Sequence, residues 1–348
     1  MRVVFLLFWL AGCQLVFPLN APPDGSATPS GEHNIAFITN KVVTGSFGGL
    51  AAADAICQQA AEGRLAPNTY VAWLSDGTTN AIDRLQGARG WVRPDGQPVA
   101  DEPSELAIRG PRVPISKTET VEEVRELSNV WTGTMSDGTR AAERCGDWTS
   151  LESGMLGDPE QGGGQFTSTT TASCQATQRL YCFGTDLATE LVDAEPAGPL
   201  WFVSSSLWSG VDADAADDIC SGEAQSAGFV GMFRAVVTRD GELISSRFDP
   251  TSNFYRVDGV LLGQLLMGAV PNTFPFLTAN KTVAAGTNEV WTGGLTRGTP
   301  ETTCSNWSVR GAGTGTSGFR HVATTNMFVE TAQLGCDHDA FVYCAQDN

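Results

Sequence analysis

Eight of the nine cysteines form two sets with nearly the same spacing, and thiol chemistry is the clearest chemistry that this sequence offers. Successive members are separated by 88, 29 and 8 residues in the first set and by 84, 32 and 8 in the second. The sets are Cys57, Cys145, Cys174 and Cys182, then Cys220, Cys304, Cys336 and Cys344. The matched spacing predicts two homologous domains with two disulfides each. Four cysteines allow three pairings, so the spacing leaves the connectivity open.

Other chemistry fits this pattern less well. Zinc-thiolate sites favour pairs of cysteines with two residues between them, and the sequence contains no such pair. A nucleophilic Ser or Cys needs a neighbouring base, but the three histidines, His33, His321 and His338, are scattered along the chain. We therefore predict no catalytic residues, no metal site and no cofactor. A pair of carboxylates acting as in glycosidases stays open as an alternative.

The ninth cysteine, Cys13, closes an N-terminal segment with the features of an export signal. Residues 1–12 contain Arg2 and an apolar run that is too short to cross a bilayer as a helix. Residues 10–13, LAGC, resemble the bacterial lipobox, which implies cleavage before Cys13 and attachment of lipid to it. An ordinary secretory signal with an incidental cysteine is the alternative. Residues 13–33 are rich in Pro, Gly, Ser and Ala and predict a lipidated, flexible tether.

The duplication extends beyond the cysteines. Residues 53–57 (ADAIC) match 216–220 (ADDIC), residues 91–96 (WVRPDG) match 254–259 (FYRVDG), and VWTG occurs at both 130–133 and 290–293. A C-x-x-W and a C-x7-C motif follow in each copy. A repeat of this length indicates two copies of one structural unit. We predict domains at 34–184 and 200–346, joined by a linker at 185–199.

Local patterns predict the elements that hold these motifs. The Ala-rich segments 49–61 and 213–225 are typical of helices, the second with Asp212 as its N-cap. Short apolar runs predict strands at 70–74, 179–183, 232–237 and 340–343. Segments 94–128 and 258–288 have no clear period, so we expect long loops. The fold class is therefore α+β, and each domain has a small, mainly antiparallel sheet with one or two helices.

The order of the helix cysteine, VWTG, C-x-x-W and C-x7-C resembles the endostatin module. It resembles more closely a bacterial lipoprotein domain family without assigned activity. Both families have the C-type-lectin-like fold, so the chain is similar to two tandem lectin-like domains. The resemblance covers nearly all of 34–184 and, more weakly, 200–346. It implies nested disulfides, with Cys57–Cys182 outside Cys145–Cys174 and Cys220–Cys344 outside Cys304–Cys336.

The resemblance also suggests ligand residues. Sugar-binding members of this fold bind calcium through a Glu-Pro-Asn type loop, and Asp101, Glu102 and Glu105 lie in a similar sequence, DEPSE. A second acidic motif of those members is missing before Cys174. Calcium binding is therefore a secondary expectation, because calcium needs several converging oxygen ligands.

Several further motifs have simpler structural explanations. The tryptophans Trp131, Trp148, Trp291 and Trp307 recur at fixed distances from disulfide cysteines, which predicts core packing, with a sugar-stacking platform as the alternative. The acidic group 212–218 suits a helix N-terminus. Residues 313–318 fit G-x-G-x-x-G but lack the context of a dinucleotide site, so we expect a glycine-rich loop.

Charge narrows the range of partners. The formal net charge of -18 argues against nucleic acid and against electrostatic docking on anionic lipid. We predict a lipid-anchored lipoprotein of the bacterial cell envelope that acts in recognition or adhesion, with a protein or glycan ligand. Gln14, where related lipoproteins of the inner membrane often have Asp, favours the outer membrane. The alternatives are an envelope polysaccharide hydrolase and a purely structural envelope protein.

Overall fold

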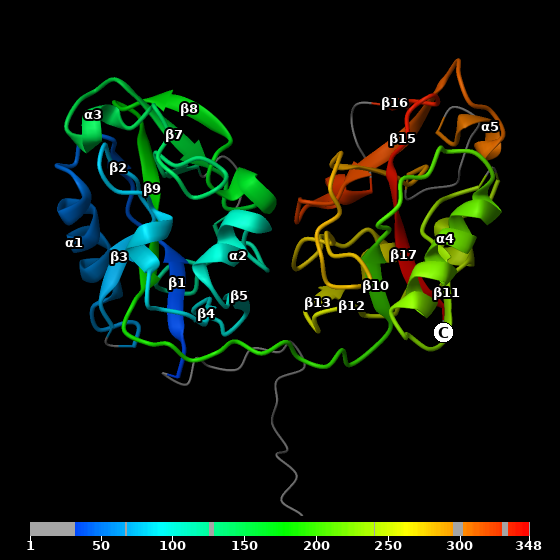
Figure 1. Cartoon of the computed structure of the whole chain (residues 1–348), viewed down its shortest axis with the longest axis horizontal. Coiled ribbons are helices and arrows are strands. Elements are labelled where there is room, and N and C mark those ends of the chain that lie inside the picture. The colour runs from blue at the N-terminus through cyan, green and yellow to red at the C-terminus, as the bar shows by residue number, and fades with distance from the viewer. Residues whose placement is uncertain are drawn as a thin grey trace, which may run out of the picture.

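The chain forms two mainly β-sheet domains with few helices. The structure, a computed structural model, describes residues 32–66, 68–124, 129–239, 241–294, 302–328 and 333–347. In Figure 1 the first domain runs from blue to green and the second from yellow-green to red, and the segment between them passes along one end of both. Cys13, the export signal and the tether up to residue 31 lie outside the described residues.

The first domain contains one sheet and short helices. Its sheet has the order β5-β4-β1-β9-β6-β7-β8, and β2 and β3 also pair with β9. The strands are β1 (Asn34–Ile38), β2 (Val43–Thr44), β3 (Tyr70–Ala72), β4 (Trp91–Val92), β5 (Pro98–Ala100), β6 (Val130–Trp131), β7 (Ser153–Gly157), β8 (Thr170–Ser173) and β9 (Thr177–Gly184). The helices are α1 (Leu50–Ala61), α2 (Pro103–Ile108) and α3 (Cys145–Trp148), with 3-10 turns at Ile82–Leu85 and Gly163–Phe166.

The second domain repeats this plan. Its sheet has the order β13-β12-β10-β17-β14-β15-β16, and β11 also pairs with β17. The strands are β10 (Leu200–Val203), β11 (Met232–Ala235), β12 (Phe254–Arg256), β13 (Leu261–Gly263), β14 (Glu289–Trp291), β15 (Thr314–Phe319), β16 (Gln333–Gly335) and β17 (Phe341–Asp347). The helices are α4 (Ala213–Ser226) and α5 (Cys304–Trp307), with 3-10 turns at Ile244–Ser246, Leu265–Met267 and Thr325–Met327.

Both sheets are mainly antiparallel, as predicted. The parallel pairs are β1 with β4, β6 with β9, β10 with β12 and β14 with β17. The predicted long helices are confirmed as α1 and α4, and the side chain of Asp212 accepts a hydrogen bond from the backbone N–H of Asp214 at the start of α4. Both helices place a buried cysteine against the sheet, and this attachment fixes the helix to the central strand of its domain.

Two expectations about irregular regions were wrong. Segments 94–128 and 258–288 are not only loops, because they contain β5, α2 and β13. Residues 314–319 form strand β15 rather than a glycine-rich loop. A side chain at Gly315 would place its Cβ 2.9 Å from the sulfur of Cys304 and 3.0 Å from the ring of Trp291. Glycine is therefore needed there for close packing, a requirement that the local sequence does not reveal.

The disulfides and the repeated tryptophans form the centre of each domain. The bonded pairs are Cys57–Cys182, Cys145–Cys174, Cys220–Cys344 and Cys304–Cys336, which is the nested arrangement that the resemblance implies. Trp131, Trp148, Trp291 and Trp307 are all buried, so the core prediction is confirmed. Within each domain the two tryptophans meet edge to face, with ring centroids 6.1 Å and 5.7 Å apart.

The C-x-x-W motif adopts an uncommon backbone in both domains. All four residues of α3 and of α5 have positive φ angles, between 48° and 66°. The left-handed conformation costs roughly 1–2 kcal/mol for each residue other than glycine. In exchange, the turn directs the cysteine into its disulfide and the tryptophan into the core. The indole N–H groups of Trp148 and Trp307 then donate to the carbonyl oxygens of Ser75 and Thr238, over 2.8 and 2.7 Å.

Candidate functional site

The two domains pack against each other through residues that are far apart in the sequence. In the first contact, the carbonyl oxygen of Arg112 accepts hydrogen bonds from Nη1 of Arg256 and Oγ1 of Thr273. In the second, the backbone N–H of Gly162 donates to the carbonyl oxygen of His321 over 2.8 Å, next to an isolated bridge between Gln161 and Val322. The long, irregular segments of both domains therefore face each other.

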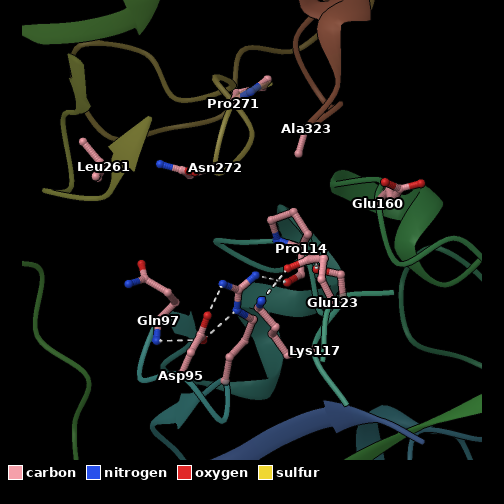
Figure 2. Close-up of a pocket in the computed structure, with 12 residues that line it drawn as sticks. Asp95, Gln97, Pro114, Lys117, Glu123, Glu160, Leu261, Pro271, Asn272 and Ala323 are labelled. Atoms are coloured by element: carbon pink, nitrogen blue, oxygen red, sulfur yellow. Dashed lines mark hydrogen bonds and ion pairs between the residues drawn. The ribbon is translucent and has the colours of Figure 1, made fainter. Parts of the chain in front are cut away.

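A polar cleft remains between these contacts, with a volume of about 220 Å³. Figure 2 shows the first domain contributing Asp95, Pro114, Lys117 and Glu123 on one side, and the second contributing Leu261, Pro271, Asn272 and Ala323 on the other. Arg93, Gln97, Ser116 and Glu160 complete the lining. Because both domains supply walls, the cleft exists only while the domains are docked.

The first charged group in the cleft is the pair of Arg93 and Asp95. Both residues belong to the turn between β4 and β5, where Nη2 of Arg93 lies 2.6 Å from Oδ2 of Asp95. Nη1 of Arg93 donates to the carbonyl oxygen of Pro114 over 3.0 Å, which joins this turn to the segment that carries the second charged group. The Arg93 side chain is therefore held in one position on the cleft wall.

The second charged group consists of Ser116, Lys117 and Glu123. Nζ of Lys117 lies 2.7 Å from Oε2 of Glu123, and Oγ of Ser116 donates to Oε1 of the same carboxylate over 2.5 Å. Burial by itself would raise the pKa of Glu123, but the hydrogen bonds from Lys117 and Ser116 and the charge of Lys117 lower it overall. Glu123 is therefore an ionised hydrogen-bond acceptor rather than a proton donor near neutral pH.

The second domain shows that the fold does not require this charged group. The backbones of Lys117 and Glu123 form an isolated β-bridge. It flanks a turn in which the N–H of Thr118 donates to the carbonyl oxygen of Glu122. The same turn recurs where Thr278 donates to Thr282, and the flanking bridge there joins Leu277 to Val283. Phe276 occupies the position that corresponds to Ser116. The same backbone is thus built from apolar side chains in one copy and from charged side chains, lining a cleft, in the other.

The Arg-x-Asp-Gly motif is also used in two different ways. Arg256 and Asp258 correspond to Arg93 and Asp95, and they form the same pair, with Nη2 of Arg256 2.7 Å from Oδ2 of Asp258. This second pair is fully buried, because Arg256 reaches across the domain interface to Arg112. The repeated motif is visible in the sequence, but nothing in the sequence indicates that one copy lines a cleft.

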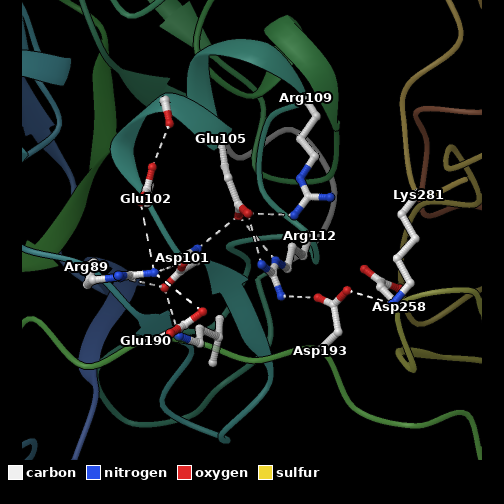
Figure 3. Close-up of polar contacts among 12 residues, drawn as sticks. Arg89, Asp101, Glu102, Glu105, Arg109, Arg112, Glu190, Asp193, Asp258 and Lys281 are labelled. Atoms are coloured by element: carbon white, nitrogen blue, oxygen red, sulfur yellow. Dashed lines mark hydrogen bonds and ion pairs between the residues drawn. The ribbon is translucent and has the colours of Figure 1, made fainter.

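The residues proposed from the sequence as calcium ligands are held mainly by arginines (Figure 3). Nη2 of Arg89 bonds Oδ2 of Asp101, while Arg109 and Arg112 bond the carboxylate of Glu105 at 2.8 and 2.9 Å. Burial by itself would raise the pKa values of Asp101 and Glu105, but both are lowered overall. The largest lowering effect is the hydrogen bond from Arg89 for Asp101 and the hydrogen bond from Arg112 for Glu105. Glu102, at the start of α2, is exposed and 4.0 Å from Arg89.

Asp101 and Glu105 thus belong to an ion network that attaches the linker to both domains. Arg112 also pairs with Asp193 of the linker over 2.9 Å, and Asp193 pairs with Lys281 of the second domain over 2.9 Å (Figure 3). Within the described parts of the chain, no cluster of three or more His, Cys, Asp or Glu side chains is arranged to hold a metal ion. The acidic group at 212–218 serves α4, where Asp217 pairs with Arg247.

The comparisons add no relative from which a role could be transferred. No protein-family model matches the chain, and no curated protein matches it. Four disulfides indicate a non-cytoplasmic protein, because such bonds persist in oxidising compartments. Among the described residues, no helix has the length and apolar character needed to cross a membrane.

Proposed function

We propose that this chain is a non-enzymatic lipoprotein of the bacterial envelope that recognises a protein or glycan ligand in the cleft between its domains. The observation that carries this proposal is the replacement of the apolar pair Leu277 and Val283 by the charged pair Lys117 and Glu123. A charged pair is more expensive to bury than an apolar one unless it is well hydrogen-bonded. The charged pair lies at the cleft, and the second domain builds the same turn with an apolar pair. This difference favours a role of the charged pair in binding.

The fold and the anchor are parts of the same proposal. The nested disulfides, the Cys-bearing helix and the C-x-x-W turn in each domain support the assignment to the C-type-lectin-like fold. The lipobox at residues 10–13 supports lipidation at Cys13, and Gln14 favours the outer membrane. Since the irregular segments of both domains pack together, one shared site replaces two independent ones, and the function depends on the pair of domains.

An array experiment tests recognition and the place of the site together. The full chain is applied to arrays of glycans, envelope proteins and matrix proteins, with and without a chelator. Asn272→Trp fills the cleft from an exposed position, and Gln225→Trp places the same side chain on the exposed surface of α4 as a control. We expect specific binding that Asn272→Trp abolishes, that Gln225→Trp retains and that chelation leaves unchanged. Specific binding that survives Asn272→Trp would exclude the cleft as the site.

The alternative hydrolase activity depends on a different residue. Burial raises the pKa of Asp158, and a raised pKa suits a general acid. This carboxylate accepts a hydrogen bond from the backbone N–H of Glu160, whose side chain lines the cleft. Release of soluble sugars from purified envelope polysaccharide by the wild type, and its loss in Asp158→Asn, would favour this alternative.

A further inference from the structure

We infer that the ligand of the cleft is a peptide segment that carries side chains of both charges, rather than a sugar. This inference rests on the proposed function and specifies the chemical class that the site accepts. Its basis is the lining of the cleft, in which the wall of the first domain carries two ion pairs, Arg93–Asp95 and Lys117–Glu123, and the further carboxylate of Glu160.

Lys117, Arg93 and Asp95 have hydrogen-bonding positions beyond those that their pair partners use. An ammonium group has three N–H donors, and Lys117 directs one of them to Glu123. A guanidinium group has five donors, and Arg93 uses three of them for Asp95 and for the carbonyl oxygen of Pro114. The carboxylate of Asp95 has about four acceptor positions, and it receives Nε and Nη2 of Arg93 and, at 3.5 Å, the N–H of Gln97. A ligand carboxylate can therefore bind beside Lys117 and Arg93, and a ligand ammonium group beside Asp95, without breaking the pairs.

The lining is less suited to sugars. A sugar ring presents a C–H face that packs well against an aromatic side chain, and the described residues that line the cleft include no aromatic ring. The apolar surface comes instead from Pro114, Pro271 and Leu261, which suit aliphatic stems such as those of Lys and Glu. On the same wall as Leu261 and Pro271, Asn272 offers an amide that can pair with a peptide backbone group.

Charge and size narrow the ligand further. Asp95, Glu123 and Glu160 outnumber Arg93 and Lys117 in the lining, so a polyanion is disfavoured. The volume of about 220 Å³ lies below the roughly 300–1,000 Å³ that is usual for sites of drug-sized molecules. The cleft therefore accepts one or two side chains of a longer segment rather than a whole large ligand.

Titration calorimetry with the full chain tests this inference. The probes are the capped tripeptides Lys-Gly-Glu and Glu-Gly-Lys, the uncharged Gln-Gly-Gln, and the neutral sugars maltotriose and chitotriose. We expect at least one mixed-charge peptide to bind at least tenfold more tightly than Gln-Gly-Gln and either sugar. Raising the salt concentration from 50 to 500 mM should weaken that binding severalfold, because the Debye length shortens.

The repeat supplies the variant for this test. Ser116→Ala/Lys117→Leu/Glu123→Val removes the charged group and copies Leu277 and Val283, which the same backbone turn accepts in the second domain. We expect it to weaken peptide binding at least tenfold. The control Arg310→Leu/Asp339→Val removes an exposed ion pair of the second domain and should change binding less than twofold. Lys117→Glu/Glu123→Lys keeps the pair but reverses it, and should weaken the preferred peptide at least fivefold.

Each other outcome overturns the inference. If the sugars bind more tightly than the peptides, the inferred ligand class is wrong, although the proposal of recognition in the cleft stands. If both Lys117 variants leave peptide binding unchanged, the peptide does not bind at the inferred site. Failure of every peptide to bind would overturn the ligand class as well, and the array result with Asn272→Trp then decides separately whether the cleft recognises anything.

Discussion

The carbonyl oxygen of Arg112 accepts a hydrogen bond from Nη1 of Arg256 over 2.8 Å, although the two residues belong to different domains. Arg112 thus contacts the second domain through its carbonyl oxygen. Its side chain pairs with Glu105 in its own domain and with Asp193 in the linker. This residue therefore connects the first domain, the linker and the second domain, which are successive segments of the sequence. The shared cleft depends on that connection.

Replacing Arg112 should loosen the docking of the domains. The side chain is almost fully buried, so Arg112→Met removes the buried cationic partner of Glu105 and Asp193 and leaves them only Arg109 and Lys281 respectively. Breaking a buried pair from one side costs about 3 kcal/mol. We expect a loss of that order in the free energy of unfolding measured with urea. Arg310→Met, which breaks an exposed pair, should cost less than about 1 kcal/mol. Equal stability of the two variants would contradict the role of Arg112.

The pH dependence of stability should contain a contribution from His321. Burial, with the nearby charge of Arg320 as the second cause, lowers the pKa of His321 to about 3. In the unfolded chain this pKa is about 6.5, so between these values the unfolded state binds one more proton than the folded state. Stability should therefore fall as the pH drops below about 6.5, by up to about 1.4 kcal/mol per pH unit.

His321→Phe separates this effect from that of the carboxylates. Among the described residues, Nδ1 of His321 has no hydrogen-bond partner, and its ring stacks on Phe276, so phenylalanine preserves the stacking and removes that unpaired nitrogen. Urea midpoints at pH 7, 6 and 5 should be flatter in the variant. Below about pH 4 both proteins should lose stability, since the folded-state pKa values of Glu105 and Asp258 are lowered overall by neighbouring arginines. Parallel curves above pH 5 would refute the contribution of His321.

The repeated VWTG motif should not tolerate a side chain on its glycine. Gly133 has a φ angle of +55°, and a Cβ there would lie 2.6 Å from the ring of Trp148. Strain and overpacking together should cost Gly133→Ala at least about 2 kcal/mol. Gly222→Ala is the control, because that helical glycine has open space around it, and alanine there should be neutral or stabilising by up to about 1 kcal/mol. Thermal unfolding of both variants checks the difference.

The nested disulfides should contribute unequally. Cys57–Cys182 joins residues 125 apart in the sequence and Cys145–Cys174 joins residues 29 apart. In the chain-entropy model the outer bond contributes about 5 kcal/mol and the inner one about 3.6 kcal/mol. Replacing each pair with alanine and measuring urea unfolding should show the larger loss for the outer pair. A larger loss for the inner pair would indicate that native-state packing, rather than unfolded-chain entropy, dominates.

Local sequence was sufficient for the features that depend on short-range physics. The spacing of the cysteines, the match of ADAIC with ADDIC and the recurrence of VWTG indicated two copies of one unit, and the Ala-rich segments predicted α1 and α4. The tryptophans could be assigned to the core because they recur at a fixed distance from disulfide cysteines. These inferences hold because helix propensity and burial are properties of segments and residue types.

Tertiary structure decided the roles of the charged residues. Arg93–Asp95 and Arg256–Asp258 share one motif and one geometry, yet the first pair lines a cleft and the second is sealed in the interface. Likewise, Asp101 and Glu105 resembled cation ligands in sequence, but Arg89 and Arg112, which are 12 and 7 residues away along the chain, pair with their carboxylates. An ionised side chain takes its role from the charges and surfaces that surround it in space. For the Arg93–Asp95 and Arg256–Asp258 pairs those neighbours include residues of the other domain, and only the docking of the two domains brings them together.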